Sequence, residues 1–250
     1  MSTPQDGHAE EPTEIVVYRP FEPRYISAQH DRPIITVSLD GWRLLWTLDN
    51  PSLKNAIWVT DASQSPDSQQ PYYDSTTESW HEVSKSSMFE PKVLSITVRV
   101  DDFELWEDNW CEYHRHSEHP ESSIDGARWG TIPDIAHVDE YGDGLHLLEC
   151  CGTQRPLGKA VSVLVKASSS EHGFVTVHDY VSTIHPWLMS LHEEIRAAHP
   201  MVLLIDDDPL APGTELLVNF WEPDLLRIEL KQDKNTIQGE GFKVQLIPIA

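Results

Sequence analysis

Short runs of β-branched and aromatic residues, each ended by proline or a turn dipeptide, constrain the fold of this 250-residue chain most strongly. Such runs are typical of short strands between turns. The clearest is KVLSITVRV, residues 92–100, whose alternating apolar and polar side chains indicate a strand with one buried face. The other runs that we predict to be strands are PTEIVVYRP, PIITVSL, WRLLWTL, NAIWVT, LHLLECC, KAVSVLVKA, MVLLI, ELLVNFW, LLRIELK and FKVQLIPIA.

One stretch, residues 176–199, has the pattern of a helix. Thr176 and Asp179 have the spacing of a capping box, in which each side chain binds the backbone N–H of the other residue. Pro186 predicts a kink or a division into two short helices, because proline lacks a backbone donor and crowds the preceding turn. The apolar residues recur every three or four positions and must face a core: they are Val177, Tyr180, Val181, Ile184, Leu188, Leu191 and Ile195.

These patterns predict an α+β fold, with a mainly antiparallel β sheet and one Pro-interrupted helix packed on a face. We expect residues 1–14 to be a disordered acidic tail and residues 15–250 to form a single domain. Two segments, near residues 61–91 and 111–143, are rich in polar residues or broken by proline and glycine. We predict long loops in both.

The chain has 41 acidic against 18 basic residues and a formal net charge of -23. Such a charge repels phosphate backbones and anionic lipid surfaces, so we expect no nucleic-acid partner. No apolar run approaches the roughly 20 residues that span a bilayer, so we expect no membrane partner. The charge suits a basic or polar protein partner.

Three cysteines, Cys111, Cys150 and Cys151, are an odd number, and two of them are adjacent. Adjacent cysteines bridge each other rarely because the linkage is strained. We therefore predict a reducing compartment, the cytoplasm or the nucleus.

Four histidines recur at every seventh position of the helical stretch: His178, His185, His192 and His199. Seven residues of α-helix rise about 10.5 Å, which is too far for one metal ion to bridge. Each histidine follows an apolar residue of the stripe or an alanine. We predict a partly exposed flank of the helix whose rings titrate near about 6.5.

A second histidine cluster lies in CEYHRHSEH and contains Cys111, His114, His116 and His119. His114 and His116 share a face of an extended segment, and a loop can fold the other two towards them, so a mononuclear zinc site is one hypothesis. Charged residues between the ligands also fit a solvated loop without any ligand. Both alternatives stay open.

Two further groups have a functional and a structural interpretation. Asp206, Asp207 and Asp208 follow an apolar run and are typical of a turn before proline, although clustered carboxylates also bind magnesium. Trp106 and Trp110 are the pair that we single out among nine tryptophans as candidate ligand-binding aromatics.

Complete catalytic motifs are missing from the sequence. GTQRPLGKA, residues 152–160, departs from the phosphate-binding loop because its spacing is one residue too long and alanine replaces the hydroxyl residue. The patterns G-x-S-x-G, H-E-x-x-H and G-x-G-x-x-G do not occur.

Several stretches together resemble a fungal domain family of unknown function that is common in mushroom-forming fungi. They are RLLWTLDNPS, LSITVRV, VTVHDYVSTIHPWL, DLLRIELK and FKVQLIPI, and the resemblance covers residues 43–250. It implies an α+β fold and an intracellular fungal protein, and it implies no catalytic residues.

We therefore predict a non-catalytic intracellular binding or regulatory module that binds protein. The alternative is a metal-dependent, hydrolase-like enzyme with its site in the region of His114, His116 and His119.

Overall fold

The computed structural model describes residues 34–61, 68–117, 120, 124–132, 145–168, 173–202 and 210–231. Its main element is a seven-stranded sheet in the order β12-β8-β14-β13-β2-β3-β4, in which only the pair β14 and β8 is parallel. Its strands are β2 Leu44–Thr47, β3 Ile57–Val59, β4 Gln70–Pro71, β8 Ser95–Val100, β12 Ser162–Lys166, β13 Leu216–Glu222 and β14 Leu225–Leu230. The α+β class and the mainly antiparallel sheet are confirmed.

Alternation decides which face of each strand is buried. In β8, Ile96, Val98 and Val100 are fully buried, and the residues between them are partly exposed. The side-chain period of a strand is two, so this pattern places one face of β8 against the core.

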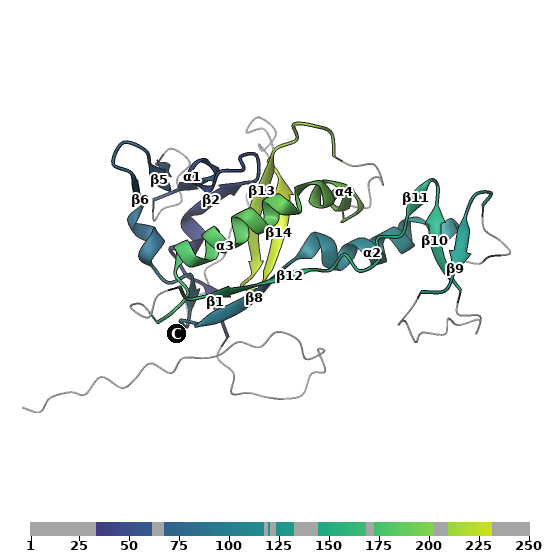
Figure 1. Ribbon diagram of the computed structural model, residues 1–250, viewed down its shortest axis with the longest axis horizontal. Helices are drawn as coiled ribbons and strands as arrows, with labels where there is room; N and C mark the ends of the chain where they lie inside the picture. Colours follow the sequence, from purple (N-terminus) through teal and green to yellow (C-terminus); the bar gives the residue numbers. More distant parts are fainter. Residues whose placement is uncertain are drawn as a thin grey trace, which may run out of the picture.

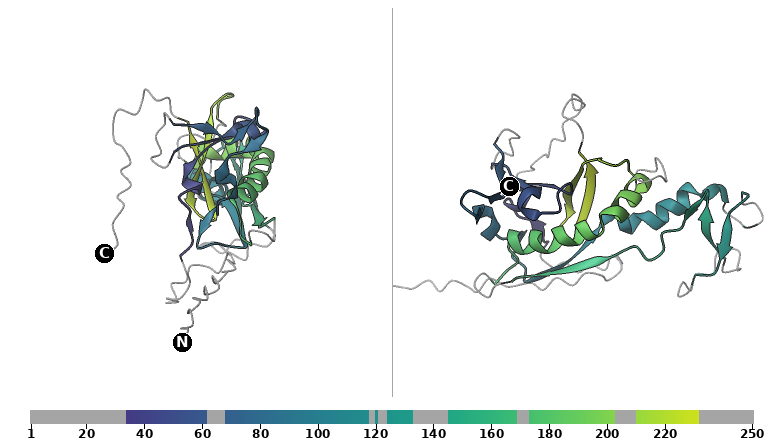
Figure 2. Two further views of the ribbon diagram at one scale, coloured as in Figure 1. Left: turned by 90° about the vertical axis from the view of Figure 1, so that its left-hand side faces the viewer. Right: turned by 45° about the horizontal axis from the view of Figure 1, so that its top comes forward.

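Helices pack on one face of the main sheet (Figure 2). The α-helices are α1 Leu53–Ala56, α2 Asp101–Tyr113, α3 Val177–Ser190 and α4 His192–Val202. The predicted capping box is present at the start of α3: Thr176 Oγ1 accepts from Asp179 N at 3.1 Å, and Asp179 Oδ2 accepts from Thr176 N at 2.9 Å. The apolar stripe of α3 and α4 is buried at Ile184, Leu188 and Ile195.

The division between α3 and α4 falls at Leu191, five residues beyond the proline. Pro186 lies inside α3. The carbonyl that it leaves without a helical partner belongs to Ser182, which is exposed, so water can bind it. The segment is therefore divided into two helices as predicted, but the division lies at Leu191 and not at Pro186.

The prediction of a single helical stretch is wrong, because α2 is a second one. Phe103, Trp106 and Trp110 recur at three- and four-residue spacing and form its apolar side. Asp101 and Asp102 lie in its first turn, where negative charge stabilises the helix dipole. The many acidic residues of this segment hide its apolar period in the sequence.

Short elements interrupt the predicted loop near residues 61–91. Besides β4, they are β5 Tyr73–Asp74 paired with β6 Ser79–Trp80, η2 Glu82–Lys85 and β7 Phe89–Glu90. β7 pairs with β1 Thr36–Val37, which precedes this segment, as does η1 Gly41–Arg43. Tyr72 of the segment is fully buried, so the aromatic residues order a segment that is otherwise polar.

A small three-stranded sheet, β11-β10-β9, lies at the far end of α2, away from the main sheet (Figure 1). It consists of β9 Arg128–Gly130, β10 His146–Cys150 and β11 Thr153–Gln154, and η3 Arg115–Ser117 follows α2. We call residues 105–117, 124–132 and 145–155 the distal lobe. The lobe contains helix and strand in part of the segment 111–143 that was predicted as a loop.

Other predictions fall outside the described residues. These are the acidic tail, the strands PTEIVVYRP and FKVQLIPIA, and the rest of the segment near 111–143. The predicted strand MVLLI begins inside α4, whose last residues are Met201 and Val202. In the part of the chain that is described, no helix combines the length and the apolar character needed to cross a membrane.

Candidate functional site

Two histidines and two cysteines meet in the distal lobe. His114 follows α2, His116 lies in η3, Cys150 ends β10 and Cys151 follows it in the turn. The two sulfur atoms are 3.9 Å apart, and His116 Nε2 lies 3.4 Å from Cys150 Sγ and 3.3 Å from Cys151 Sγ. One donor atom from each of His114, Cys150 and Cys151 lies within 4.8 Å of the others. We call these four residues the His–Cys cluster.

The backbone of α2 orients His114. Its Nδ1 lies 2.8 Å from Trp110 O, and because a carbonyl only accepts, Nδ1 carries the proton and donates. In the neutral ring, Nε2 is then an acceptor, and it lies 3.4 Å from Thr153 Oγ1. His114 is fully buried, so this orientation is held by packing as well as by the hydrogen bond.

A tight hairpin turn positions the cysteines. β10 and β11 pair with Cys150 opposite Thr153, which leaves Cys151 and Gly152 as a two-residue loop. Both loop residues have positive φ, 52° and 84° respectively, as a type I′ turn requires. Cys150 is buried and Cys151 is exposed, so the cluster lies at the surface of the lobe.

The structure brings together only part of the predicted metal site. His114 and His116 are neighbours, but the sulfur atoms beside them belong to Cys150 and Cys151 and not to Cys111. Cys111 is half-buried on α2 and packs against the lobe core, and burial raises the pKa of its thiol, which disfavours the thiolate that binds metal. His119 lies outside the described residues.

The sequence interpretation missed both adjacent cysteines as candidate ligands. It used their adjacency only to argue against a disulfide. The signal was the order Cys-Gly between two strand runs, which places a cysteine at the tip of a hairpin.

The two tryptophans that were predicted to bind a ligand have packing roles. Trp110 is 2% exposed in the lobe core, and its Nε1 donates to Thr153 Oγ1 at 3.1 Å. Trp106 is partly buried and packs against both the lobe core and the main core. The predicted aspartates Asp206, Asp207 and Asp208 lie outside the described residues.

The helical histidines do not form a continuous partly exposed flank, so that prediction is wrong for two of the four. His185 and His199 are buried, and His178 is half-buried with its ring centroid 4.6 Å from that of Trp80. His192 keeps a side chain that is 26% exposed. Segments from β2, β6 and α2 cover this side of the helices, which the helix sequence alone does not reveal.

Two of these histidines join distant elements. His185 Nδ1 accepts from Trp46 Nε1 at 3.1 Å, and its Nε2 donates to Asn50 O at 3.0 Å. Burial lowers the pKa of His185, and the hydrogen bond to Asn50 opposes this shift only in part. His199 Nδ1 lies 2.8 Å from Asp102 Oδ1, and both side chains are buried.

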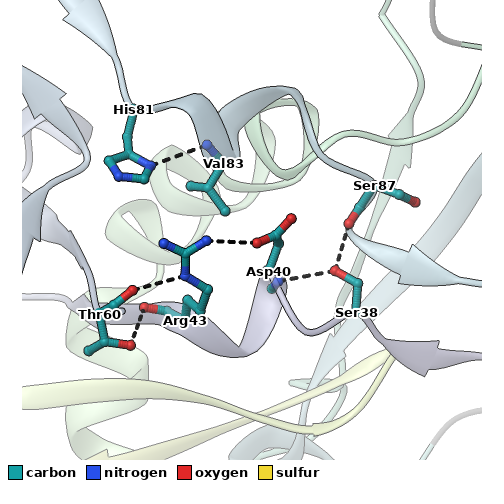
Figure 3. A network of polar contacts seen from close by, with 8 residues as sticks. Ser38, Asp40, Arg43, Thr60, His81, Val83 and Ser87 are labelled. Atoms are coloured by element: carbon teal, nitrogen blue, oxygen red, sulfur yellow. Dashed lines mark hydrogen bonds and ion pairs between the residues drawn. The ribbon is translucent and has the colours of Figure 1, made fainter. Parts of the chain in front are cut away.

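A cleft of about 630 Å³ lies beside η1 and β7, at the other end of the molecule from the lobe. Figure 3 shows how its polar groups are used. Arg43 binds Asp40 Oδ1 and Thr60 O, each at 2.9 Å, and Ser38 Oγ donates to Ser87 O at 2.6 Å. These contacts fasten η1 to its neighbours, and we assign the cleft no ligand.

Comparison with known proteins identifies no relative: neither a family model, nor a curated protein, nor a solved structure matches this chain. The resemblance to a fungal domain family over residues 43–250 therefore stays a prediction, and the candidate site rests on geometry.

Proposed function

We propose that this chain is a non-catalytic intracellular binding module that recognises a basic protein partner through the distal lobe. The observation that carries the proposal is the arrangement of α2, which holds a small sheet away from the main sheet (Figure 1). An element that extends from a larger core offers a partner a surface on several sides.

The exposed side of α2 has the chemistry for such a partner. Leu105, Asp108 and Glu112 lie at helical positions i, i+3 and i+7, so they share one face, opposite the buried Trp110. Leu105 and the nearby Tyr113 are 37% and 38% exposed, and Asp108 and Glu112 are also exposed. Apolar and acidic groups together suit an amphipathic segment that carries lysine or arginine.

A metal-dependent enzyme is the second candidate function. The observation that favours it is the exposure of His116 and Cys151, which places part of the His–Cys cluster in contact with solvent. Three protein ligands around a zinc ion leave a position for a reactive water. We prefer the binding module because His116 lies 3.4 and 3.3 Å from the two sulfurs and can serve as a fourth ligand beside His114, and four protein ligands leave no such position.

Peptide titration of the full chain tests the binding module. A fluorescent, lysine-rich amphipathic peptide should bind, and Asp108→Asn and Leu105→Ala should each weaken binding roughly two- to fivefold, as expected for exposed contacts. The matched control is Glu193→Gln, which makes the same charge change at an 88% exposed side chain on α4. If this control weakens binding as much as Asp108→Asn, net charge alone attracts the peptide and the proposal fails.

A further inference from the structure

We infer that His114, His116, Cys150 and Cys151 are the four ligands of a structural zinc ion. The inference rests on the geometry of the His–Cys cluster and does not depend on the partner proposed above. It joins the end of α2 to the β10–β11 hairpin through one ion.

Distances within the cluster match a tetrahedral zinc site. Zn–S bonds of about 2.3 Å and Zn–N bonds of about 2.0–2.1 Å at tetrahedral angles separate two sulfurs by about 3.8 Å, and sulfur from nitrogen by about 3.6 Å. The observed Cys150–Cys151 separation is 3.9 Å, and His116 Nε2 lies 3.4 and 3.3 Å from the two sulfurs. A donor atom of His114 lies within 4.8 Å of both sulfurs, and the ring would have to move towards His116 to complete the tetrahedron.

A hydrogen bond fixes the orientation of the His114 ring. A histidine that binds metal through one nitrogen usually donates from the other to a carbonyl or carboxylate, which fixes the ring. His114 Nδ1 makes this bond to Trp110 O, so a metal would bind this ring through Nε2. Thr153 Oγ1 lies 3.4 Å from this nitrogen and donates its one proton to Cys150 O at 3.1 Å, and so links the two halves of the site.

The turn conformation of Cys151 is a separate argument. Cys151 has φ 52°, in the left-handed region that disfavours residues with a side chain. The first loop position of a type I′ turn prefers asparagine, aspartate or glycine, so cysteine is a poor choice for the backbone. Strain at a side chain that completes a donor set points to a function for that side chain, here the sulfur atom.

The lobe also needs a cross-link. Its own core contains three buried residues, Trp110, Leu147 and Cys150, and is separate from the core of the main sheet. A core of this size does not stabilise a fold alone, and small domains commonly use a metal or disulfides instead. No disulfide joins the three cysteines, so a metal is the cross-link that the donor set supports.

The donor set selects the ion and its role. Two thiolates and two imidazoles in a tetrahedral arrangement favour zinc over magnesium or calcium, which prefer oxygen. Four protein ligands fill the coordination shell, as in structural zinc sites. His116 and Cys151 lie at the surface and offer the ion a path of entry.

Elemental analysis of the purified full chain should find about one zinc per chain. Replacing zinc by Co²⁺ should produce the visible absorption bands of tetrahedral cobalt and a thiolate charge-transfer band. Metal binding to the apo protein should release protons as the thiols ionise. A wild-type protein that holds no zinc, and gives no tetrahedral bands with added Co²⁺, would overturn the assignment.

Three variants distinguish a loss of metal binding from a loss of folding stability. Cys151→Asn should weaken Co²⁺ binding and roughly halve the cobalt thiolate band, since Cys150 still supplies one thiolate, yet leave the melting temperature of the apo protein unchanged or higher, because asparagine suits the turn better. His116→Ala should weaken Co²⁺ binding by at least roughly 100-fold, more than loss of a group that only supports a ligand. The control Cys111→Ala should keep one metal ion per chain.

The opposite pattern refutes the inference. If Cys111→Ala loses the metal while Cys151→Asn keeps it, the ligands are those of the sequence hypothesis. If His116→Ala binds Co²⁺ as tightly as the wild type, the site has three protein ligands and the structural assignment is wrong.

Discussion

Replacing His185 by leucine should destabilise the protein mainly through Trp46. The indole of Trp46 is 1% exposed, and its Nε1 donates to His185 Nδ1 at 3.1 Å. Without the imidazole, a buried donor loses its acceptor, which costs about 1–3 kcal/mol. The lost bond to Asn50 O adds about 0.5–1.5 kcal/mol. A total of about 2–4 kcal/mol lowers the melting temperature by roughly 5–15 °C.

A double-mutant cycle isolates this effect. Trp46→Phe removes the donor, so His185→Leu made in that background should cost less than in the wild type by about 1–3 kcal/mol. Urea unfolding of the four proteins measures the difference, and unchanged m-values show that the comparison is valid. Additivity within about 0.5 kcal/mol would refute the claim that the hydrogen bond links the two residues.

The same residue predicts a pH dependence. Burial lowers the pKa of His185 in the folded protein, whereas the unfolded chain titrates near about 6.5. Below about pH 6.5 the unfolded state therefore binds more protons than the folded state. As the pH is lowered, the free energy of unfolding decreases until the pH reaches the pKa of His185 in the folded protein. Between pH 7 and acidic pH, the free energy of unfolding of the His185→Leu variant should decrease less than that of the wild type. Equal slopes would contradict the assigned protonation.

Three other predictions follow from burial and charge. Leu188→Asp places an unpaired charge in the core and should cost several kcal/mol, seen as a large fall in melting temperature; an unchanged melt would show that this face is not buried. His199→Leu removes the buried hydrogen bond between His199 Nδ1 and Asp102 Oδ1 and should cost about 1–3 kcal/mol in urea unfolding, and a loss below about 0.5 kcal/mol would contradict this contribution. The net charge of -23 predicts no submicromolar binding of random DNA or RNA in a gel shift at physiological salt.

The fold was predictable where a short segment contains its own signal. The alternation of β8 and the capping box of Thr176 and Asp179 are local patterns, and both are present. α2 was missed because its three apolar residues lie among many acids. The break at Leu191 was misplaced because the effect of Pro186 depends on whether water reaches the carbonyl of Ser182.

The candidate site was half predictable. His114 and His116 were named because they lie close together in the sequence, and the same criterion selected Cys111, whereas the sulfurs that lie near His114 belong to Cys150 and Cys151. Helix geometry points Cys111 towards the lobe core, while a hairpin 34 positions beyond His116 supplies Cys150. Spacing along the chain indicates possible ligands but does not specify the strand pairing that brings them together.

The sequence by itself determined the properties that depend on neighbours along the chain: the strand runs, the helix start at Thr176, the acidic charge and the absence of complete catalytic motifs. Only the tertiary structure decided which imidazoles are buried and which donors share a site. The pKa of His185 is lowered because distant segments bury its ring, and Cys150 lies beside His116 because α2 and β10 pack together in one lobe. Exposure and ligation depend on contacts between segments far apart in the sequence, and such contacts form only when the chain packs.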